Sequence, residues 1–320
     1  MVAVVIPSYK VKKHIAEVIA SIGPEVAVIY VVDDACPEGS GRYVEEQCKD
    51  PRLRVLYNQK NLGVGGAVME GYKKAVAEGA DIMVKLDGDG QMDARLIPAL
   101  IKPILQYKAD YVKGNRFFDP SYLHKMPLMR VIGNSFLSLI NKFVTGYWNI
   151  MDPTNGFTAI HRSAIEILPL HKIEKRYFFE SDMLFRLGTV HAVVQDMPMK
   201  AVYGDEKSSL RIARVLFEFP PKYFVRLFKR IGYRYFLRDF NIGTLELGVG
   251  LLLSGIGGYY GIHYWHTNAV RGVITPTGTV MLASLPVIFG FQFLLSFLHF
   301  DIANVPKKPL CELLEDNPVI

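Results

Sequence analysis

Residues 82–91 read Ile-Met-Val-Lys-Leu-Asp-Gly-Asp-Gly-Gln, a short apolar run that leads into two aspartates one residue apart. The glycines after Asp87 and Asp89 let the backbone turn, so that both carboxylates can converge on one point. Two carboxylates and the amide oxygen of Gln91 are hard oxygen ligands of the kind that Mg²⁺ or Mn²⁺ prefers. The same pattern also fits a polar turn after a buried strand, because Asp and Gly are common turn residues. The surrounding chain must distinguish the two interpretations.

Apolar runs alternate with helical patterns through the first third of the chain. The expected strands cover residues 2–6, 26–32, 53–57, 82–86 and 111–113. Residues 11–22 carry apolar side chains at a helical period, and further helical patterns separate the later strands. This alternation predicts an α/β fold with a mainly parallel sheet and helices on both of its faces.

Polar residues gather where the expected strands end. Asp33 and Asp34 follow the second strand, a loop with Asn61 and Gly63 follows the third, and Asp87 follows the fourth. In such sheets, ligands bind beyond the carboxyl ends of the strands. Three polar groups at one edge are harder to explain as independent turns, so we expect a binding site there.

Composition divides the chain unevenly. Half of the 320 residues are hydrophobic and the net charge is +6, with the apolar excess concentrated in residues 243–300. The three cysteines have neither metal-ligand nor disulfide spacing, which favours a reducing compartment. An apolar strand is expected from Val2 onward with no basic region before it, so we expect no signal peptide.

Residues 207–238 interleave Lys and Arg with aromatic side chains. Such a segment fits single-stranded nucleic acid or an amphipathic juxtamembrane helix. The chain that follows favours the membrane, because residues 243–265 and 279–300 are each long and apolar enough to span a bilayer. We therefore expect a membrane partner and no nucleic acid. Gly257 and Gly261 form a GxxxG pattern that could serve as a helix contact.

Charge predicts the topology. Lys and Arg are dense before the first span, Lys307 and Lys308 follow the second, and the connecting loop holds only Arg271. The positive-inside rule then places the large domain and the C-terminus in the cytoplasm. The expected division is a catalytic domain at 1–206, a basic amphipathic segment at 207–240, two transmembrane helices at 241–300 and a tail at 301–320.

Four motifs carry a resemblance to a known family. They are V-I-P-S-Y at 5–9, V-D-D at 32–34, N-L-G-V-G-G-A at 61–67 and L-D-G-D-G-Q at 86–91. In order and spacing they resemble family 2 glycosyltransferases, in the branch with dolichol-phosphate mannose synthase and polyprenyl-phosphate glycosyltransferases. G-N-R at 114–116, D-P-T-N-G-F at 152–157 and two C-terminal spans also fit that branch.

The resemblance implies a Rossmann-like GT-A fold. It also implies inverting transfer of one hexose from a GDP or UDP sugar to a polyprenyl or dolichyl phosphate. The implied nucleotide-binding residues are Pro7, Tyr9, Asp33, Asp34, Asn61, Gly63 and Asp87. The implied ligands of a divalent ion, Mg²⁺ or Mn²⁺, are Asp87, Asp89 and Gln91. The branch includes oligomers, so the oligomeric state stays open.

The acceptor side follows from the same resemblance. The implied lipid-phosphate residues are Arg116, Arg130, Asn134, Ser135 and Lys207. An arginine common in the branch falls on Ala201 here, which leaves Lys200 or Lys207 as its substitute.

The catalytic set is expected to be Asp87 and Asp89, with Asp152 or Asp182 orienting the acceptor or taking a proton. Asp152 also fits an Asx-turn cap before Pro153. Glu180 and Asp182 also fit charges at a helix N-terminus.

Three other functions are alternatives for a chain with these features. A processive polysaccharide synthase would carry Gln-x-x-Arg-Trp, and neither Trp148 nor Trp265 follows such a run. A nucleotidyltransferase has no need of membrane spans and would carry a Gly-rich triphosphate loop near residue 10. A non-catalytic membrane scaffold or nucleotide sensor stays open until turnover is measured.

Overall fold

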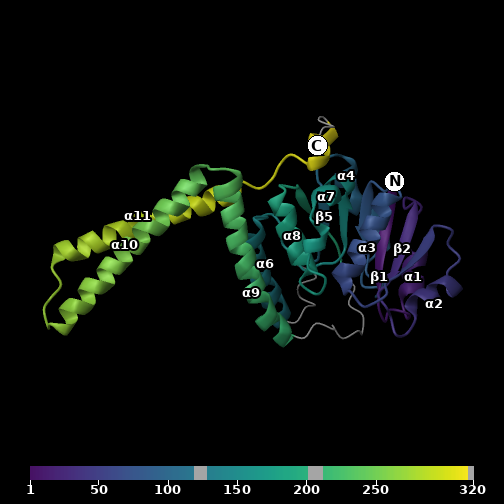
Figure 1. The fold of residues 1–320 in the computed structure, drawn as a ribbon, viewed down its shortest axis with the longest axis horizontal. Helices are drawn as coiled ribbons and strands as arrows, with labels where there is room; N and C mark the ends of the chain where they lie inside the picture. The colour runs from purple at the N-terminus through teal and green to yellow at the C-terminus, as the bar shows by residue number, and fades with distance from the viewer. Residues whose placement is uncertain (119–127, 201–211, 316–320) are drawn as a thin grey trace. The chain divides into compact units, whose positions relative to one another are not determined.

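The computed structural model describes residues 1–118, 128–200 and 212–315 (Figure 1). The chain folds into two compact units, residues 1–227 with 306–320, and residues 228–305. The first unit thus extends past the predicted boundary at 206, and the C-terminal segment belongs to it rather than forming a separate tail. Both differences arise because helix α9 and the C-terminal segment pack against the first unit.

A seven-stranded sheet forms the centre of the first unit. Its strands are β1 (Val2–Ser8), β2 (Val28–Asp33), β3 (Leu53–Tyr57), β4 (Ile82–Lys85), β5 (Tyr111–Asn115), β6 (Thr158–His161) and β7 (Val194–Pro198). They lie in the order β3-β2-β1-β4-β6-β5-β7. The β-branched runs of β1 and β2 are almost fully buried, as expected for strands covered on both faces.

Strand β6 runs against the others. The pairs β1–β2, β1–β4, β2–β3 and β5–β7 are parallel, whereas β6 is antiparallel to both β4 and β5. Its first residue, Thr158, pairs with Lys85 and Lys113 near the carboxyl ends of their strands. The turn that precedes β6 therefore lies at the edge where the parallel strands end.

Helices cover both faces of the sheet, as predicted. They are α1 (Ile15–Ala20), α2 (Ser40–Gln47), α3 (Val64–Ala77), η1 (Ala94–Leu96), α4 (Ile97–Leu105), α6 (Leu128–Thr145), α7 (Arg162–Ile167), η2 (Leu170–Lys172) and α8 (Phe179–Thr189). Helices α1 and α4 share one apolar core with Val4 and Ile6 of β1. On the other face, Gly71 lets α3 pack closely against Val5 and Val32.

Helix α9 (Ile212–Ile231) begins in the first unit and continues into the second. Phe219 and Tyr223 of α9 form a small buried cluster with Val144 of α6 and Phe178 before α8. The rings of Phe178 and Tyr223 meet edge to face with centroids 4.9 Å apart. This packing is why the first half of α9 belongs to the first unit.

The C-terminal segment docks on the first unit through Asp110, which is fully buried. Its carboxylate accepts hydrogen bonds from the backbone N–H groups of Leu310 at 2.9 Å and Cys311 at 3.1 Å, at the start of α12 (Leu310–Glu315). It also accepts from Val193 N–H at 2.7 Å. All three bonds satisfy a carboxylate that would otherwise be costly to bury.

The second unit consists of the end of α9, a π-helical segment η3 (Gly232–Arg238), α10 (Ile242–Val270) and α11 (Thr277–Ala303). Both α10 and α11 are long and apolar enough to cross a membrane, and only 22% and 6% of their most apolar windows are buried. Core helices of soluble proteins would be mostly buried.

The two long helices pack tightly where their residues are small. A side chain at Gly257 of α10 would lie 2.7 Å from the carbonyl oxygen of Ala283 in α11, and one at Gly261 would lie 3.1 Å from the Ala283 Cβ. The GxxxG pattern is thus a helix contact. Ser296 Oγ of α11 donates a hydrogen bond to Glu246 Oε1 of α10 at 2.5 Å.

Candidate active site

Asp33 and Asp34 follow β2 and hold the loops around them. Asp33 accepts from the N–H groups of Cys36 at 2.7 Å and Gly41 at 2.6 Å. Asp34 accepts from Leu62 N–H at 2.8 Å, and it also accepts from Asn58 Nδ2 and Gly63 N–H at 2.8 Å. Both aspartates are almost completely buried, so they shape this edge of the sheet from within.

The loop that holds Asn61 and Gly63 lies directly against Asp34. Asn61 Nδ2 donates to the Asp34 carbonyl at 3.2 Å. Gly63 has φ = +83° and faces the Lys175 carbonyl so closely that a Cβ would lie 2.5 Å from it. Only glycine meets both conditions without strain. The structure thus brings Asp34, Asn61 and Gly63 together.

Tyr9 lies just past the end of β1, and 44% of its surface is exposed. Pro7 is the penultimate residue of that strand and pairs with Val32 of β2 in the residue register. The Asp34 N–H donates to the Ser8 carbonyl at 3.1 Å, which joins the two strand ends. An exposed aromatic ring at this position is available to stack on a ligand base.

Asp87 is held by Lys85, a buried lysine at the end of the preceding strand, β4. Lys85 Nζ lies 2.7 Å from Asp87 Oδ1 and 3.4 Å from Glu180 Oε1, and only 1% of the Lys85 side chain is exposed. Burial opposes the charge of Lys85, but the two carboxylates outweigh burial and raise its pKa. The sequence motif at 86–91 assigned no role to Lys85. A lysine inside an apolar strand nevertheless indicates a buried, paired charge.

Asp89 and Gln91 form a tight turn around Gly90, which has φ = +76°. Asp89 Oδ1 accepts from Gln91 N–H at 3.0 Å. Carboxylate and amide oxygens on one turn are a donor set that suits Mg²⁺ or Mn²⁺. Among the residues that the structure describes, no group of three His, Cys, Asp or Glu forms a complete metal cage.

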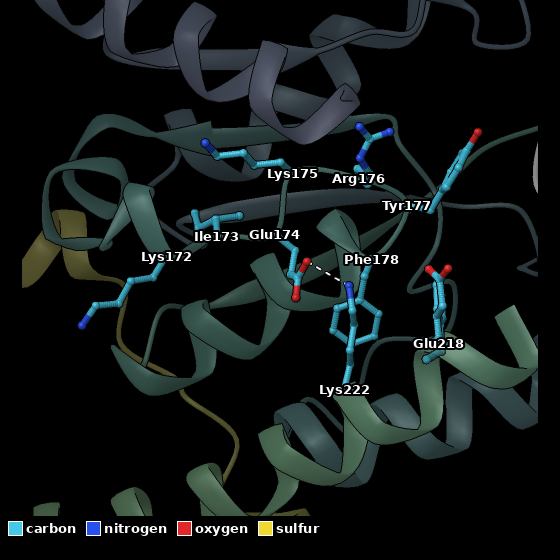
Figure 2. Close-up of a pocket in the computed structure, with 10 residues that line it drawn as sticks. Lys172, Ile173, Glu174, Lys175, Arg176, Tyr177, Phe178, Glu218 and Lys222 are labelled. Carbon is cyan, nitrogen blue, oxygen red and sulfur yellow. Dashed lines mark hydrogen bonds and ion pairs between the residues drawn. The ribbon is translucent and has the colours of Figure 1, made fainter. Parts of the chain in front are cut away.

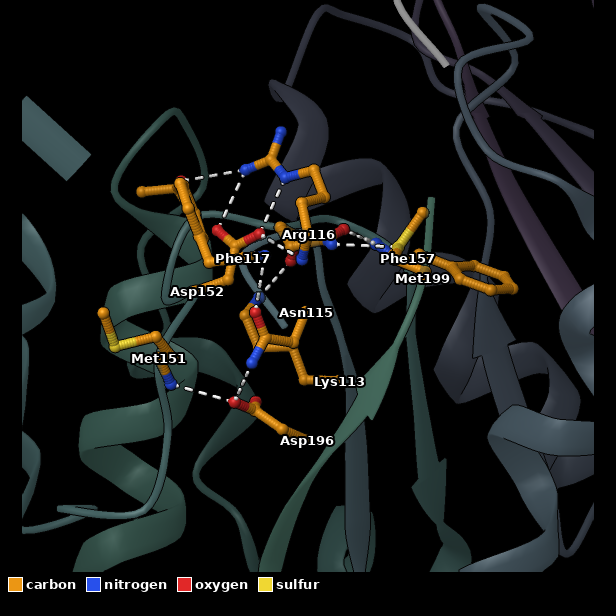
Figure 3. Close-up of polar contacts among 11 residues, drawn as sticks. Lys113, Asn115, Arg116, Phe117, Met151, Asp152, Phe157, Asp196 and Met199 are labelled. Carbon is orange, nitrogen blue, oxygen red and sulfur yellow. Dashed lines mark hydrogen bonds and ion pairs between the residues drawn. The ribbon is translucent and has the colours of Figure 1, made fainter. Parts of the chain in front are cut away.

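Arg116 and Asp152, predicted to act separately, form a bidentate ion pair (Figure 3). Arg116 Nε lies 2.7 Å from Asp152 Oδ2, and Nη2 lies 2.9 Å from Oδ1. The Asp152 side chain is 1% exposed and that of Arg116 is 24% exposed. The Asp152 carboxylate therefore holds Arg116 in place, and the Arg116 side chain stays partly exposed.

Gly156 connects this turn with the 87–91 motif. A Cβ at Gly156 would lie 2.6 Å from Asp87 Oδ2 and still closer to Lys85 Nζ. Lys85 Nζ also donates to the Gly156 carbonyl at 3.2 Å. The turn that contains Asp152 and the turn that contains Asp87 are therefore in direct contact.

A second buried lysine lies on β5, two strands from β4 in the sheet, beneath the same turn (Figure 3). Lys113 donates to the Asn155 carbonyl, and burial lowers its pKa to about 8. Its register partner Asp196 accepts from Asn115 Nδ2 and Met151 N–H, both at 2.9 Å, and burial raises the pKa of Asp196 to about 6. The sequence analysis did not predict this network. The one indication of it in the sequence is Lys113, a lysine inside an apolar strand.

Asp182 lies apart from this cluster, in the first turn of α8, and is fully buried. It accepts from Arg186 Nε at 2.9 Å, Arg226 Nε at 3.0 Å and Glu174 N–H at 2.9 Å. Glu174 in turn binds Lys222 at 2.9 Å, beside an open pocket of about 640 Å³ between residues 172–178 and α9 (Figure 2). These charges join α8 to α9.

The remaining acceptor-side residues lie on or beyond α6. Asn134 is half-buried and Ser135 is exposed on that helix. Arg130 is on α6, but its side chain lies outside the described part of the chain, as do Lys207 and Ala201. Their predicted contact with lipid phosphate therefore stays a prediction.

Comparison with known proteins identifies the relatives of this chain. Residues 3–168 match the profile of Glycosyl transferase family 2. The UDP-N-acetylglucosamine–dolichyl-phosphate N-acetylglucosaminyltransferase of Methanococcus voltae is 31% identical, over 71% of this chain and 94% of its own. The undecaprenyl-phosphate mannosyltransferase of Micrococcus luteus is 30% identical, over 58% of this chain and 77% of its own.

The fold has solved counterparts. Glucosyl-3-phosphoglycerate synthase from Mycobacterium tuberculosis, in complex with Mn²⁺, UDP and glucosyl-3-phosphoglycerate, has a TM-score of 0.52 and 19% identity. The match covers 72% of this chain and 80% of that one. The likeness confirms the predicted GT-A fold.

Proposed function

Because this chain belongs to glycosyl transferase family 2, we propose that it moves one sugar from a nucleotide sugar to the phosphate of a polyprenyl or dolichyl lipid. One observation carries the proposal: through Gly156, the Asp87 turn touches the turn whose Asp152 holds Arg116. In this proposal a donor-binding motif and a partly exposed arginine therefore share one edge. The names of the two sequence relatives, which act on dolichyl and undecaprenyl phosphate, support this acceptor class.

The donor occupies the ends of β1, β2 and β4 in this proposal. Tyr9 and the loop held by Asp34 contact the base and ribose, with Pro7, Asn61 and Gly63 shaping the pocket. Asp33 supports the donor site indirectly, because its carboxylate holds the backbone around Gly41. GDP and UDP sugars both fit this description, since base specificity depends on pocket shape.

A divalent ion completes the donor site. Asp89 and Gln91, with Asp87 beside them, would hold Mg²⁺ or Mn²⁺, and the ion would neutralise the charge of the leaving nucleoside diphosphate. The oxygen donors on the Gly90 turn fit such an ion. The Mn²⁺ in the structurally similar glucosyl-3-phosphoglycerate synthase supports the assignment.

The acceptor phosphate is already an anion near neutral pH, so it needs positioning more than a strong base. Arg116 binds it, together with Arg130, Asn134, Ser135 and Lys207. An acceptor oxygen attacks the anomeric carbon in line, the bond from that carbon to the diphosphate breaks, and the configuration inverts. Asp152 acts by orienting Arg116. Asp182, fully buried against Arg186 and Arg226, acts by positioning α8.

Membrane attachment accounts for the lipid acceptor. In this proposal helices α10 and α11 span the bilayer, and the charge asymmetry of the chain supports a cytoplasmic catalytic unit. Phe217 and Phe224 of α9 expose 81% and 64% of their surfaces, and Ile132 and Phe136 of α6 are also largely exposed. Such apolar side chains beside basic residues fit a lipid interface.

The test is sugar transfer by the purified full chain. A panel of radiolabelled GDP and UDP sugars is incubated with polyprenyl phosphate in vesicles, and butanol-extractable label is counted. We expect one donor to label the lipid with a single sugar. Nucleotide binding without transfer would instead indicate a sensor, and growing chains would indicate a processive synthase.

A further inference from the structure

We propose that Lys85 is a positioning residue that orients Asp87 toward the sugar donor. The inference rests on the proposed function, because it assumes that Asp87 binds the donor. Lys85 itself cannot touch a ligand, since its side chain is 1% exposed at the end of β4. Lys85 can therefore act on the donor only through the groups that it contacts and through its charge.

Those contacts fix one side of the Asp87 carboxylate. Lys85 Nζ lies 2.7 Å from Asp87 Oδ1, and it is itself held by the Gly156 carbonyl at 3.2 Å. The other oxygen, Oδ2, faces the bare Cα of Gly156, where a Cβ would lie 2.6 Å away. An anchored ammonium on one side and a glycine on the other leave the carboxylate little freedom to rotate. The Asp87 side chain is nevertheless 28% exposed and accessible to a ligand.

Charge gives Lys85 a second effect on the donor. Asp87, Glu180 and Lys85 form a cluster around the buried ammonium with a net charge of −1, and without the lysine this cluster would carry −2. The donor diphosphate is itself an anion, so added negative charge beneath its site repels it. Loss of the lysine would therefore both free the carboxylate and oppose the donor.

The chain offers a matched control in Lys113. It is also a fully buried strand lysine that donates to a carbonyl of the same turn, but its acceptor is Asn155 and not Gly156. Its register partner on β7 is Asp196, and β5 separates β7 from β6. Lys113→Met removes a comparable buried ammonium without removing the bond to Asp87, so it separates loss of turn stability from loss of Asp87 orientation.

The experiment is a double-mutant cycle read by nucleotide binding rather than by activity. UDP and GDP are titrated calorimetrically into the purified full chain, first with EDTA and then with Mn²⁺. The variants are Lys85→Met, Asp87→Asn, the double variant and Lys113→Met, each checked by its thermal unfolding midpoint. We expect Lys85→Met to weaken binding of the preferred nucleotide at least tenfold, and Lys113→Met by less than threefold. In the Asp87→Asn background, Lys85→Met should weaken binding by no more than about threefold, because only its effect on charge remains.

Three results would overturn the inference while leaving the proposed function intact. They are wild-type affinity in Lys85→Met, equal losses in the two lysine variants, or additive losses in the cycle. Binding of neither nucleotide by the wild type would overturn the proposed function and the inference together.

Glu180→Gln covers the case in which Lys85→Met fails to fold. This variant lowers the negative charge and leaves Lys85 to Asp87 alone, so nucleotide binding should stay equal or become tighter. A tenfold loss would show that Glu180, and not the Lys85–Asp87 pair, carries donor binding, and would overturn the inference.

Discussion

Arg116 donates to both carboxylate oxygens of Asp152, through Nε at 2.7 Å and Nη2 at 2.9 Å. The two residues are 36 positions apart and come from the end of β5 and the turn before β6. A bidentate pair fixes the plane of the guanidinium as well as its position. The pair presents a partly exposed cation at the edge where Asp87 lies, and its geometry can be tested from both sides.

Arg116→Lys keeps the charge and removes the planar fork. We expect the KM for polyprenyl phosphate to rise at least tenfold, because a lysine cannot be held in the same orientation. The KM for the nucleotide sugar should stay within twofold. Steady-state kinetics with each substrate varied in turn checks this, and a change confined to the donor KM would contradict the acceptor role.

Asp152→Asn tests the same pair from its buried side. The neutral amide cannot accept two charge-assisted hydrogen bonds, so the variant should lose about 2 kcal/mol of stability. It should also show the acceptor-side defect of Arg116→Lys. A variant with a normal acceptor KM but little turnover would instead indicate that Asp152 takes a direct part in the reaction.

Gly156→Ala should disable the site with one methyl group. The new Cβ would lie 2.6 Å from Asp87 Oδ2 and closer still to Lys85 Nζ, so the pair must move apart. We expect at least a hundredfold loss of transfer and weaker nucleotide binding. Gly133→Ala on α6 is the control, because a Cβ there meets no atom within 4 Å. Equal activity of the two variants would contradict the proposed contact.

Asp196 gives the catalytic unit a pH-dependent stability. Its pKa in the folded protein, about 6, lies above the ordinary value of 3.8 because of burial. Between these values the folded protein holds a proton that the unfolded chain has lost, so stability falls as pH rises from about 4 to 6. At about 1.4 kcal/mol per pKa unit the effect is on the order of 1–3 kcal/mol.

Asp196→Asn should remove that slope. Its amide oxygen can still accept from Asn115 and Met151, and no charge remains to be desolvated. Thermal midpoints of the two proteins, measured from pH 4.5 to 7.5, should diverge with rising pH, with the variant more stable above pH 6. Parallel curves would show that Asp196 titrates normally.

Several features of the fold follow from local patterns. The β-branched runs and intervening helical periods predicted the sheet and the helices on both faces, because burial on both faces imposes continuous apolar strands. The strand ends also placed Asp34 and Asp87 at one edge, as parallel topology requires. The separation of Gly257 and Gly261 by one helical turn predicted a contact that the structure contains.

Other features depend on contacts between distant residues. The direction of β6 is set by where the chain returns to the sheet, and a four-residue strand carries no signal of direction. The pairing of Arg116 with Asp152, and of Arg226 with Asp182, joins residues 36 and 44 positions apart. Lys85 and Lys113 were visible as charges inside strands, but their acceptors were not.

Removal of the metal should stop the reaction without unfolding the protein. After EDTA treatment we expect transfer to fall at least a hundredfold and to return with Mn²⁺ or Mg²⁺, because the Gly90 turn supplies only part of a coordination sphere. The thermal midpoint of the ligand-free protein should change little. Undiminished transfer in EDTA would contradict the role proposed for Asp89 and Gln91.

The most direct test of the central claim is the mass of the lipid product. The preferred nucleotide sugar is added to purified wild-type protein and to Asp89→Ala, each in matched vesicles with polyprenyl phosphate. The masses of the extracted lipids are then measured by mass spectrometry. The proposed function predicts a gain of one sugar residue with the wild type and none with a folded, membrane-bound Asp89→Ala. Normal conversion by Asp89→Ala, or no sugar added by the wild type with any donor, would contradict it.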